Sequence, residues 1–341
     1  MSSMTDLRDC RILVTGGAGF IGSATVAQLM DLGCRNILVV DDLTRGRPDN
    51  LDFAKKSARV SLTVGDIRDR RLMDSLIDGV DTVFHLAALR ITHCVAEPRQ
   101  AIEVMIDATH DLMELCVKAK VRKVVMASTA SIYGMASVFP TPEEQNPYGN
   151  RTLYGAAKSF GEALLRSFNE MYGLNYMALR YFNVYGPRMD IQGKYTEVLI
   201  RWMQRIEAGA PPIIFGDGSQ TMDMVYVDDV ARANVLAASA QASDFALNIG
   251  GGSEISLLEL AERLAAAMGR PDLRPIHETA RQVNSVSRRF ADISAATRVI
   301  GFRPEVSLDL GLQRLIAWRR AQHDRTGKWR FLSDSNQQAA G

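Results

Sequence analysis

Residues 11–22 read RILVTGGAGFIG, and this stretch decides the fold. Residues 12–15 are aliphatic or β-branched, which is typical of a short buried strand, and a helical pattern follows the stretch. Gly16, Gly19 and Gly22 lie between the two with the spacing GxxGxxG. Without Cβ atoms they allow a tight turn and bring backbone N–H groups close to a pyrophosphate, which the helix N-terminus stabilises. The stretch therefore predicts a dinucleotide-binding turn.

The next predicted strand, NILVVDD, ends in a carboxylate that supports this interpretation. Asp41 lies about 20 residues beyond the turn, where an acidic side chain accepts hydrogen bonds from the adenosine ribose. The 2′-phosphate of NADP would be repelled by the negative charge of this carboxylate. The sequence therefore predicts NAD rather than NADP as the cofactor.

Strands and helices alternate through the first half of the chain. Separated in this way, strands indicate a parallel sheet with helices on both faces, so we expect an α/β fold with a Rossmann-type doubly wound sheet. The predicted strands lie in RILVTG, NILVVDD, VSLTVGD, DTVFHLAA, KVVMAS, NYMALRYFNV, VYVDD and ALNIG.

Glycine and proline breakers separate short helices in the second half. We expect residues 1–183 and 223–252 to form the NAD-binding domain, and residues 184–222 and 253–320 to form a smaller, discontinuous α/β lobe for the substrate. Residues 321–341 are polar with little periodicity and are expected to be a tail.

Composition excludes several function classes. The 40 Lys and Arg residues balance 39 Asp and Glu residues without a basic block, which argues against a nucleic-acid partner.

No stretch approaches the length of a membrane span, and no secretory signal is visible. The four cysteines form no CxxC pair, which favours reduced thiols and a cytoplasmic protein. The five histidines show no metal-binding spacing, and His85 is expected to be a packed core residue.

Tyr154 and Lys158 stand four residues apart in a helical pattern, so their side chains share one face. An ammonium beside a phenol favours the phenolate and makes a base near neutral pH. A strand ends shortly before them in a hydroxyl-rich loop with Ser128, Thr129 and Ser131. Ligands bind at strand ends in such sheets, so these hydroxyls are candidate substrate contacts.

Taken together, these motifs resemble the extended short-chain dehydrogenase/reductases, in the branch of NAD-dependent nucleotide-sugar epimerases and dehydratases. The likeness is strongest to enzymes of the UDP-glucose 4-epimerase type and covers most of residues 11–318. It runs from TGGAGFIG through VVDDL, GDIRD, VFHLAA, ASTASIYG, YGAAK, RYFNVYGPR, GDGSQTMDMVYVDDVA and LNIGGG to ADISAATRVIGFRP.

The resemblance implies a role for individual residues. It implies catalytic roles for Thr129, Tyr154 and Lys158, and substrate contacts for Ser128, Thr129, Asn183 and Arg281. The residues implied in cofactor binding are Gly16, Gly19, Phe20, Ile21, Gly22, Asp41, Asp66, Ile67, Leu86, Ala87, Ala88, Tyr154 and Lys158.

Departures from the family pattern narrow the choice among the reactions that this family catalyses. Sugar dehydratases of this branch carry Asp and Glu where this chain has Ala130 and Ser131, and decarboxylases carry a glutamate in the same loop. Their absence leaves 4-epimerisation. Met222 replaces an arginine expected to contact the diphosphate, and Met105 replaces a frequent asparagine.

In the resemblance to the epimerases, Arg289 falls near the position whose side chain controls how large a sugar the site accepts. A bulky cation there could exclude an N-acetyl group or pair with a uronate carboxylate, and a solvent-facing arginine is the plain alternative.

The expected reaction is NAD-dependent 4-epimerisation of a nucleotide sugar, with UDP as the expected nucleotide, through a transient 4-keto sugar. Two alternatives stay open: an NAD-dependent nucleotide-sugar oxidoreductase with net redox, and a non-catalytic NAD(H)-sensing protein. The resemblance also implies a homodimer joined through helices near residues 107–119 and 154–168.

Overall fold

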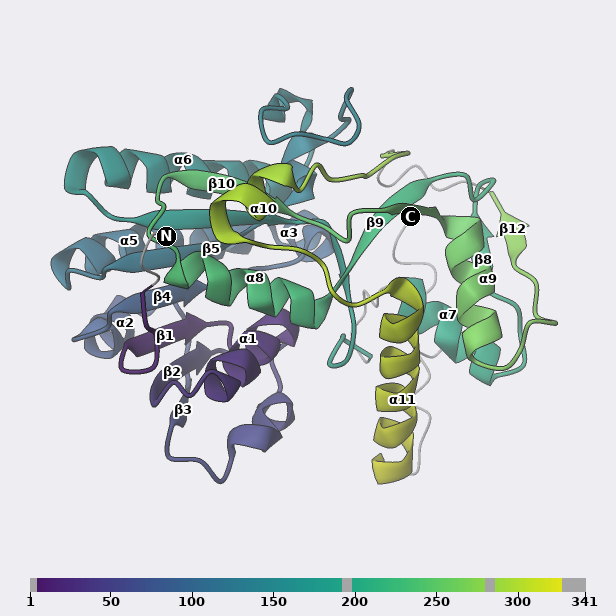
Figure 1. Ribbon diagram of the computed structural model, residues 1–341, viewed down its shortest axis with the longest axis horizontal. Helices are drawn as coiled ribbons and strands as arrows, with labels where there is room; N and C mark the ends of the chain where they lie inside the picture. Colours follow the sequence, from purple (N-terminus) through teal and green to yellow (C-terminus); the bar gives the residue numbers. More distant parts are fainter. Residues whose placement is uncertain (1–4, 192–197, 280–285, 327–341) are drawn as a thin grey trace.

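The computed structural model describes residues 5–191, 198–279 and 286–326. Its centre is a seven-stranded parallel sheet with the order β10-β6-β5-β4-β1-β2-β3 (Figure 1). Strands β1, β4, β5 and β6 are almost wholly buried, as expected for aliphatic strands covered on both faces. The predicted doubly wound α/β fold is confirmed. The strands are β1 (Arg11–Thr15), β2 (Asn36–Asp41), β3 (Val60–Val64), β4 (Thr82–His85), β5 (Lys123–Thr129), β6 (Tyr176–Tyr181) and β10 (Phe245–Ile249).

Helices cover both faces of this sheet, and each face has its own apolar core. One core joins the sheet to α1 (Phe20–Asp31) and α8 (Val227–Ser239), which pack against each other. The other joins it to α2 (Arg70–Ile77), α5 (Ala108–Lys118) and α6 (Leu153–Tyr172). Shorter helical segments complete this part. They are η1 (Pro48–Ala54), α3 (Ile91–Ala96), α4 (Pro98–Ile102), η2 (Glu103–Asp107), η3 (Ala130–Tyr133) and η4 (Pro147–Gly149).

A second group of elements forms a separate core, away from the large sheet (Figure 1). It contains a three-stranded sheet ordered β11-β9-β7 and a two-stranded sheet of β12 and β8. Three helices pack with these strands. The elements are β7 (Asn183–Tyr185), α7 (Val198–Glu207), β8 (Ile213–Phe215), β9 (Thr221–Tyr226), β11 (Glu254–Ser256), α9 (Leu257–Ala267), β12 (Ile276–Glu278) and α11 (Leu308–Thr326).

Three predictions differ from the structure. The predicted strand NYMALRYFNV is divided between β6, which ends at Tyr181 in the large sheet, and β7, which begins at Asn183 in the three-stranded sheet. The predicted strand VYVDD is divided, since β9 ends at Tyr226 and the helix α8 begins at Val227. The carboxylates of Asp228 and Asp229 lie in the first turn of α8, where they suit the positive end of the helix dipole. Helix α11 continues to Thr326, so residues 321–326 of the predicted tail are helical; the buried Leu312, Leu315 and Ile316 anchor its earlier turns.

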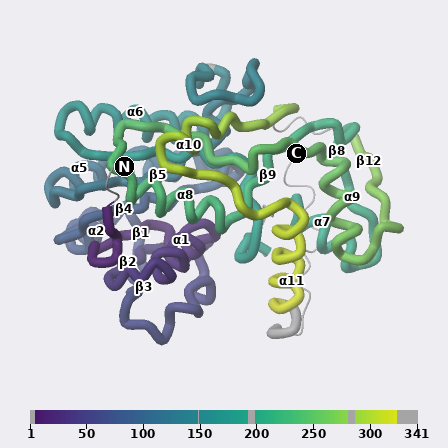
Figure 2. Tube along the Cα trace, viewed as in Figure 1, coloured from purple at the N-terminus to yellow at the C-terminus, as the bar shows by residue number. Residues whose placement is uncertain are grey.

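Helix α10 (Ser294–Ile300) packs on the large sheet although it follows the second lobe in the chain. Ala296, Ile300 and Phe302 belong to the same core as α1 and α8. Figure 2 shows this segment returning to the side of α8 before the chain goes on to α11. The predicted boundary assigned all of residues 253–320 to the substrate lobe and so did not foresee that α10 packs on the large sheet. The division into two lobes stays a prediction.

In the described part of the chain, no helix combines the length and apolar character that crossing a bilayer requires.

Candidate active site

The glycine turn lies where the strand order of the large sheet reverses, because β1 pairs with both β2 and β4. Gly16 has φ +68°, and a Cβ there would lie 2.8 Å from the backbone of Ala87. A Cβ on Gly22 would lie 2.1 Å from the carbonyl oxygen of Gly16. No side chain caps the first turn of α1. Glycine at both positions therefore lets the turn close tightly, and the uncapped backbone N–H groups at the start of α1 suit an anionic group.

Asp41 ends β2 beside this turn. Its Oδ2 accepts a hydrogen bond from the N–H of Ala18 at 3.0 Å, and its Oδ1 accepts one from the N–H of Leu43 at 2.9 Å. The carboxyl is buried, and desolvation raises its pKa although these backbone donors oppose the shift. Asp41 thus stiffens the glycine turn and presents a desolvated carboxyl to the same space.

One cavity of 1510 Å³ runs from the glycine turn to the second lobe. It exceeds the range of about 300–1,000 Å³ that is usual for one small ligand, so two ligands can share it. Of the predicted site residues, only Arg281 is not placed, because it lies outside the described residues. The others line the cavity: Gly16, Gly19, Phe20, Ile21, Gly22, Asp41, Asp66, Ile67, Leu86, Ala87, Ala88, Ser128, Thr129, Tyr154, Lys158, Asn183 and Arg289.

Asp66 follows β3 at the dinucleotide end of the cavity. Its Oδ2 lies 2.6 Å from a guanidinium nitrogen of Arg68, and its Oδ1 accepts from the N–H of the same residue at 2.8 Å. The hydrogen bonds from the Arg68 side chain lower the pKa of the Asp66 carboxyl. The carboxylate is therefore ionised and held in one orientation before any ligand arrives.

The predicted catalytic residues come from two adjacent elements. Tyr154 and Lys158 lie in the first turns of α6, whose N-cap Thr152 accepts from the N–H of Gly155 at 3.1 Å. Thr129 is the last residue of β5, and its Oγ1 accepts from the N–H of Ser131 at 3.1 Å. All three predicted side chains line the same cavity.

Lys158 is a buried ammonium. Its Nζ donates to the carbonyl oxygen of Ala127 at 2.8 Å, and its side chain is almost inaccessible to solvent. Desolvation lowers the pKa of Lys158 to about 8. The group is consequently protonated at neutral pH but close to losing its proton.

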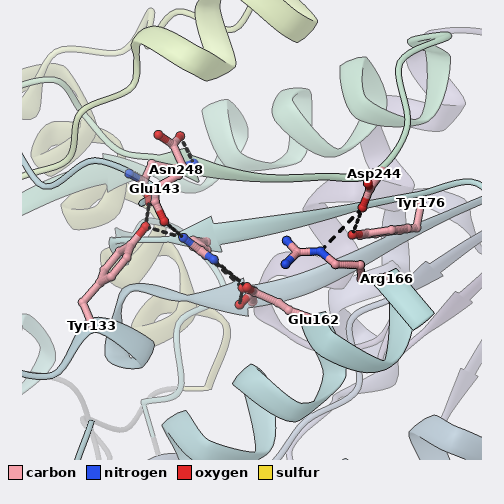
Figure 3. A network of polar contacts seen from close by, with 9 residues as sticks. Tyr133, Glu143, Glu162, Arg166, Tyr176, Asp244 and Asn248 are labelled. Carbon is pink, nitrogen blue, oxygen red and sulfur yellow. Dashed lines mark hydrogen bonds and ion pairs between the residues drawn. The ribbon is translucent and has the colours of Figure 1, made fainter. Parts of the chain in front are cut away.

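Sequence reasoning missed a buried polar network behind this site (Figure 3). Glu162, one helical turn after Lys158, lies 2.7 Å from a guanidinium nitrogen of Arg180 on β6. Arg180 also donates to the Tyr133 hydroxyl at 2.9 Å, and that hydroxyl donates to Asn248 at 2.6 Å. The network ties α6 to three separate parts of the main domain. The four-residue step from Lys158 was the only sequence signal for Glu162.

Ser128 belongs to this network as well as to the cavity wall. Its Oγ donates to a carboxylate oxygen of Glu162. The Ser128 hydroxyl proton is thus directed toward the protein, and Thr129 is the better placed of the two for a ligand.

On the side of the second lobe, Asn183 begins β7. Its Nδ2 makes only a weak contact of 3.6 Å to the sulfur of Met222, and its buried Oδ1 has no hydrogen-bond partner among the described residues. A buried amide oxygen without a partner is costly, so a ligand donor at this point would be stabilising.

Further arginines add positive charge to the cavity wall, among them Arg188 and Arg201, which were not predicted. Arg188, in the GPR segment, donates to the Ser23 hydroxyl at 3.2 Å and stacks on the ring of Phe53 at 5.0 Å. Arg201 comes from α7. Their position gives the cavity cations that a bound diphosphate requires, although Met222 provides none.

His85 is a core residue, as expected. It is buried, and its Nδ1 and Nε2 pair with the hydroxyls of Thr15 and Thr109 at 2.9 and 3.1 Å. Desolvation lowers the pKa of the imidazole to about 3, so it stays neutral.

One cluster of metal-ligand side chains occurs among the described residues, at His110, Asp111 and Glu114. Arg70 already lies within 2.8 Å of both carboxylates, which makes the cluster an ion-pair network.

Exchanging Asp41 for asparagine should weaken NAD binding by about 10-fold or more and raise the affinity for NADP relative to NAD. The amide keeps the shape but removes the charge that repels a 2′-phosphate and one acceptor for ribose hydroxyls. Fluorescence titration with both cofactors measures the ratio. Asp78→Asn, at an exposed carboxylate that does not line the cavity, is the matched control and should leave the ratio within about 2-fold. An unchanged ratio in Asp41→Asn, with an unchanged melting temperature, would contradict the assignment.

Comparison with known proteins gives consistent similarities. The family model described as "Epimerase: NAD dependent epimerase/dehydratase family" matches residues 12–250. The UDP-glucose 4-epimerase of Mycolicibacterium smegmatis is 36% identical over 91% of this chain and 98% of its own length. The UDP-glucose 4-epimerase of Thermotoga maritima, solved with UDP-glucose, is 36% identical with a TM-score of 0.85 and covers 92% of this chain and 99% of its own. The UDP-N-acetylglucosamine 4-epimerase of Methanobrevibacter ruminantium, solved with UDP-N-acetylmuramic acid, is 32% identical with a TM-score of 0.87 over the same shares.

Proposed function

Because the chain belongs to the NAD-dependent epimerase/dehydratase family, we propose that it inverts C4 of a UDP-sugar with NAD as its retained cofactor. One observation carries the choice of reaction. Thr129, Tyr154 and Lys158 line the cavity that contains the glycine turn, while the loop after β5 offers Ala130 and Ser131 where a dehydratase needs carboxylates.

The residues at the glycine turn suit a dinucleotide. A Cβ on Gly22 would collide with the carbonyl of Gly16, so only glycine there lets the turn pack closely against the start of α1, where a pyrophosphate would bind; Asp41 lies beside the turn for the ribose. Asp66 and Ile67 would contact the adenine, and Leu86, Ala87 and Ala88 would line the nicotinamide. When bound, NAD supplies a hydride acceptor and donor for C4.

The chain's own residues move and hold the proton. Tyr154 accepts the proton of the sugar 4-hydroxyl and later returns it, while the ammonium of Lys158 favours the phenolate. Thr129 holds the same sugar oxygen through its hydroxyl. Asn183 accepts from a sugar hydroxyl through its unsatisfied amide oxygen, or donates to the phosphates through its amide N–H groups. The substrate leaves with C4 inverted and no net change in oxidation state.

Incubating the purified protein with UDP-glucose tests this function. We expect chromatography to show UDP-galactose at equilibrium while absorbance at the NADH band stays constant. A steady rise in that absorbance would favour the oxidoreductase with net redox. No turnover of neutral, N-acetylated or acidic UDP-sugars, with NAD still bound, would favour the non-catalytic NAD(H)-sensing protein.

We also propose a homodimer in the cytoplasm. Helices α5 and α6 pack side by side, and Phe160, Met171 and Tyr172 leave apolar surface exposed on α6. The four cysteines are buried and free, which supports a reducing compartment.

A further inference from the structure

Arg289 faces the cavity because of the conformation of its segment. Its N–H donates to the carbonyl oxygen of Thr221 at 3.1 Å, and Asp223 accepts from the N–H of Ala291 at 3.1 Å, which together hold the segment along β9. The backbone of the preceding Arg288 forms an isolated β-bridge with Thr221, and its side chain forms an ion pair with Glu254 at 2.8 Å. Successive side chains of an extended segment point to opposite sides. Arg288 therefore points to the surface, and Arg289 lines the cavity.

The guanidinium of Arg289 has no counterion in the described part of the chain. No carboxylate there lies within ion-pair distance of it, and no hydrogen-bond acceptor contacts it, although the side chain is half-buried. Burial lowers the pKa of Arg289, and the nearby phenol of Tyr154 acts in the opposite direction. A partly desolvated cation without a partner is unfavourable, and an anionic ligand group relieves that cost.

Arg289 lies toward the part of the cavity where the proposed function places the sugar. Arg289 and Tyr154 line the same cavity, and the phenol of Tyr154 partly offsets the fall in the pKa of Arg289 that its burial causes, whereas the acidic Asp41 and Asp66 lie beside the glycine turn and after β3. Asn183, with its unsatisfied oxygen, contacts Met222, which directly follows the Thr221 that holds Arg289. The amide of Asn183 and a cation without a partner among the described residues thus line the cavity where the sugar would lie.

We propose that Arg289 binds a carboxylate carried by the hexose, so that the preferred substrate is a nucleotide uronate. This inference rests on the proposed function. A planar guanidinium binds a carboxylate through two parallel hydrogen bonds, and C6 of a uronate is two bonds from the C4 that Tyr154 serves. The reaction stays an inversion at C4 without loss of the carboxylate.

The test compares kcat/KM for UDP-glucuronate and UDP-glucose in the wild type and in Arg289→Ala. The wild type should prefer the uronate, and the substitution should lower the ratio of uronate to glucose by about 100-fold. Arg289→Lys should recover part of the ratio. Arg288→Ala, which removes the neighbouring surface cation, should leave the ratio within about 2-fold.

Measuring the binding of UDP alone shows whether Arg289 recognises the carboxylate of the sugar or the diphosphate. An equal loss for both sugars together with weaker UDP binding would assign Arg289 to the diphosphate and overturn the inference. Turnover of UDP-glucose with a ratio that Arg289→Ala does not change would overturn it while leaving the proposed function intact. Turnover of neither sugar in a folded, NAD-bound wild type would overturn this inference, and failure of N-acetylated UDP-sugars as well would overturn the proposed function.

Discussion

Tyr154→Phe is expected to lower kcat for C4 inversion by about 1,000-fold or more while NAD binding stays within about 2-fold. The substitution removes only the hydroxyl that exchanges the proton, and general acid–base catalysis contributes about 10²–10⁴-fold. The ring keeps its packing beside Leu89, Cys94 and Ala157. Chromatographic assay of the product and release of bound NAD by denaturation measure the two quantities separately.

Tyr172→Phe is the matched control, because Tyr172 lies on the same helix but is exposed and remote from the cavity wall. It should retain wild-type turnover. If Tyr154→Phe kept more than about a tenth of the wild-type rate, another group would have to carry the proton, and the assignment of Tyr154 would be wrong.

Lys158→Met should have opposite effects on activity and stability. Activity should fall by about 100-fold or more, because the phenolate of Tyr154 loses its neighbouring cation. Stability at pH 7 should rise, because burying the ammonium opposes folding: its pKa falls from 10.5 to about 8. Between these values the unfolded chain binds more protons than the folded one, so the stability of the wild type rises with pH. The advantage of the variant should therefore shrink from pH 8 upward and be lost near pH 10.5.

Thermal melting at pH 7 and pH 10 measures this change. Lys118→Met removes an exposed lysine that pairs with Asp74 on the surface, and it should show no such pH-dependent gain. A Lys158→Met protein that melts below the wild type at pH 7 would show that the hydrogen bond to Ala127 outweighs the cost of burial. Unchanged turnover would remove Lys158 from the mechanism.

The dinucleotide half of the site could be predicted because its signals are local. A strand, three glycines and Asp41 follow one another within a short stretch, and the geometry that they require is a backbone geometry. The step from Tyr154 to Lys158 is equally local. The predicted family is confirmed by the family model and by relatives of near-equal length.

The supporting network could not be predicted, because it depends on which strands become neighbours. Glu162 looks like an ordinary polar residue of an amphipathic helix until β6 lies beside β5 and brings Arg180 against it. The same applies to α10, whose apolar residues have the periodicity of any short helix. Only the folded chain shows that they cover the large sheet.

The opposite directions of Arg288 and Arg289 have a consequence for how such a protein diversifies. Since side chains along this extended segment alternate, a shift of one residue against β9 would turn the surface arginine inward and the cavity arginine outward. The residue of this segment that faces the cavity is therefore determined by segment length as well as by the identity of the amino acid. Insertions and deletions upstream of Arg288 are thus a route to new substrate preferences that leaves every catalytic residue in place.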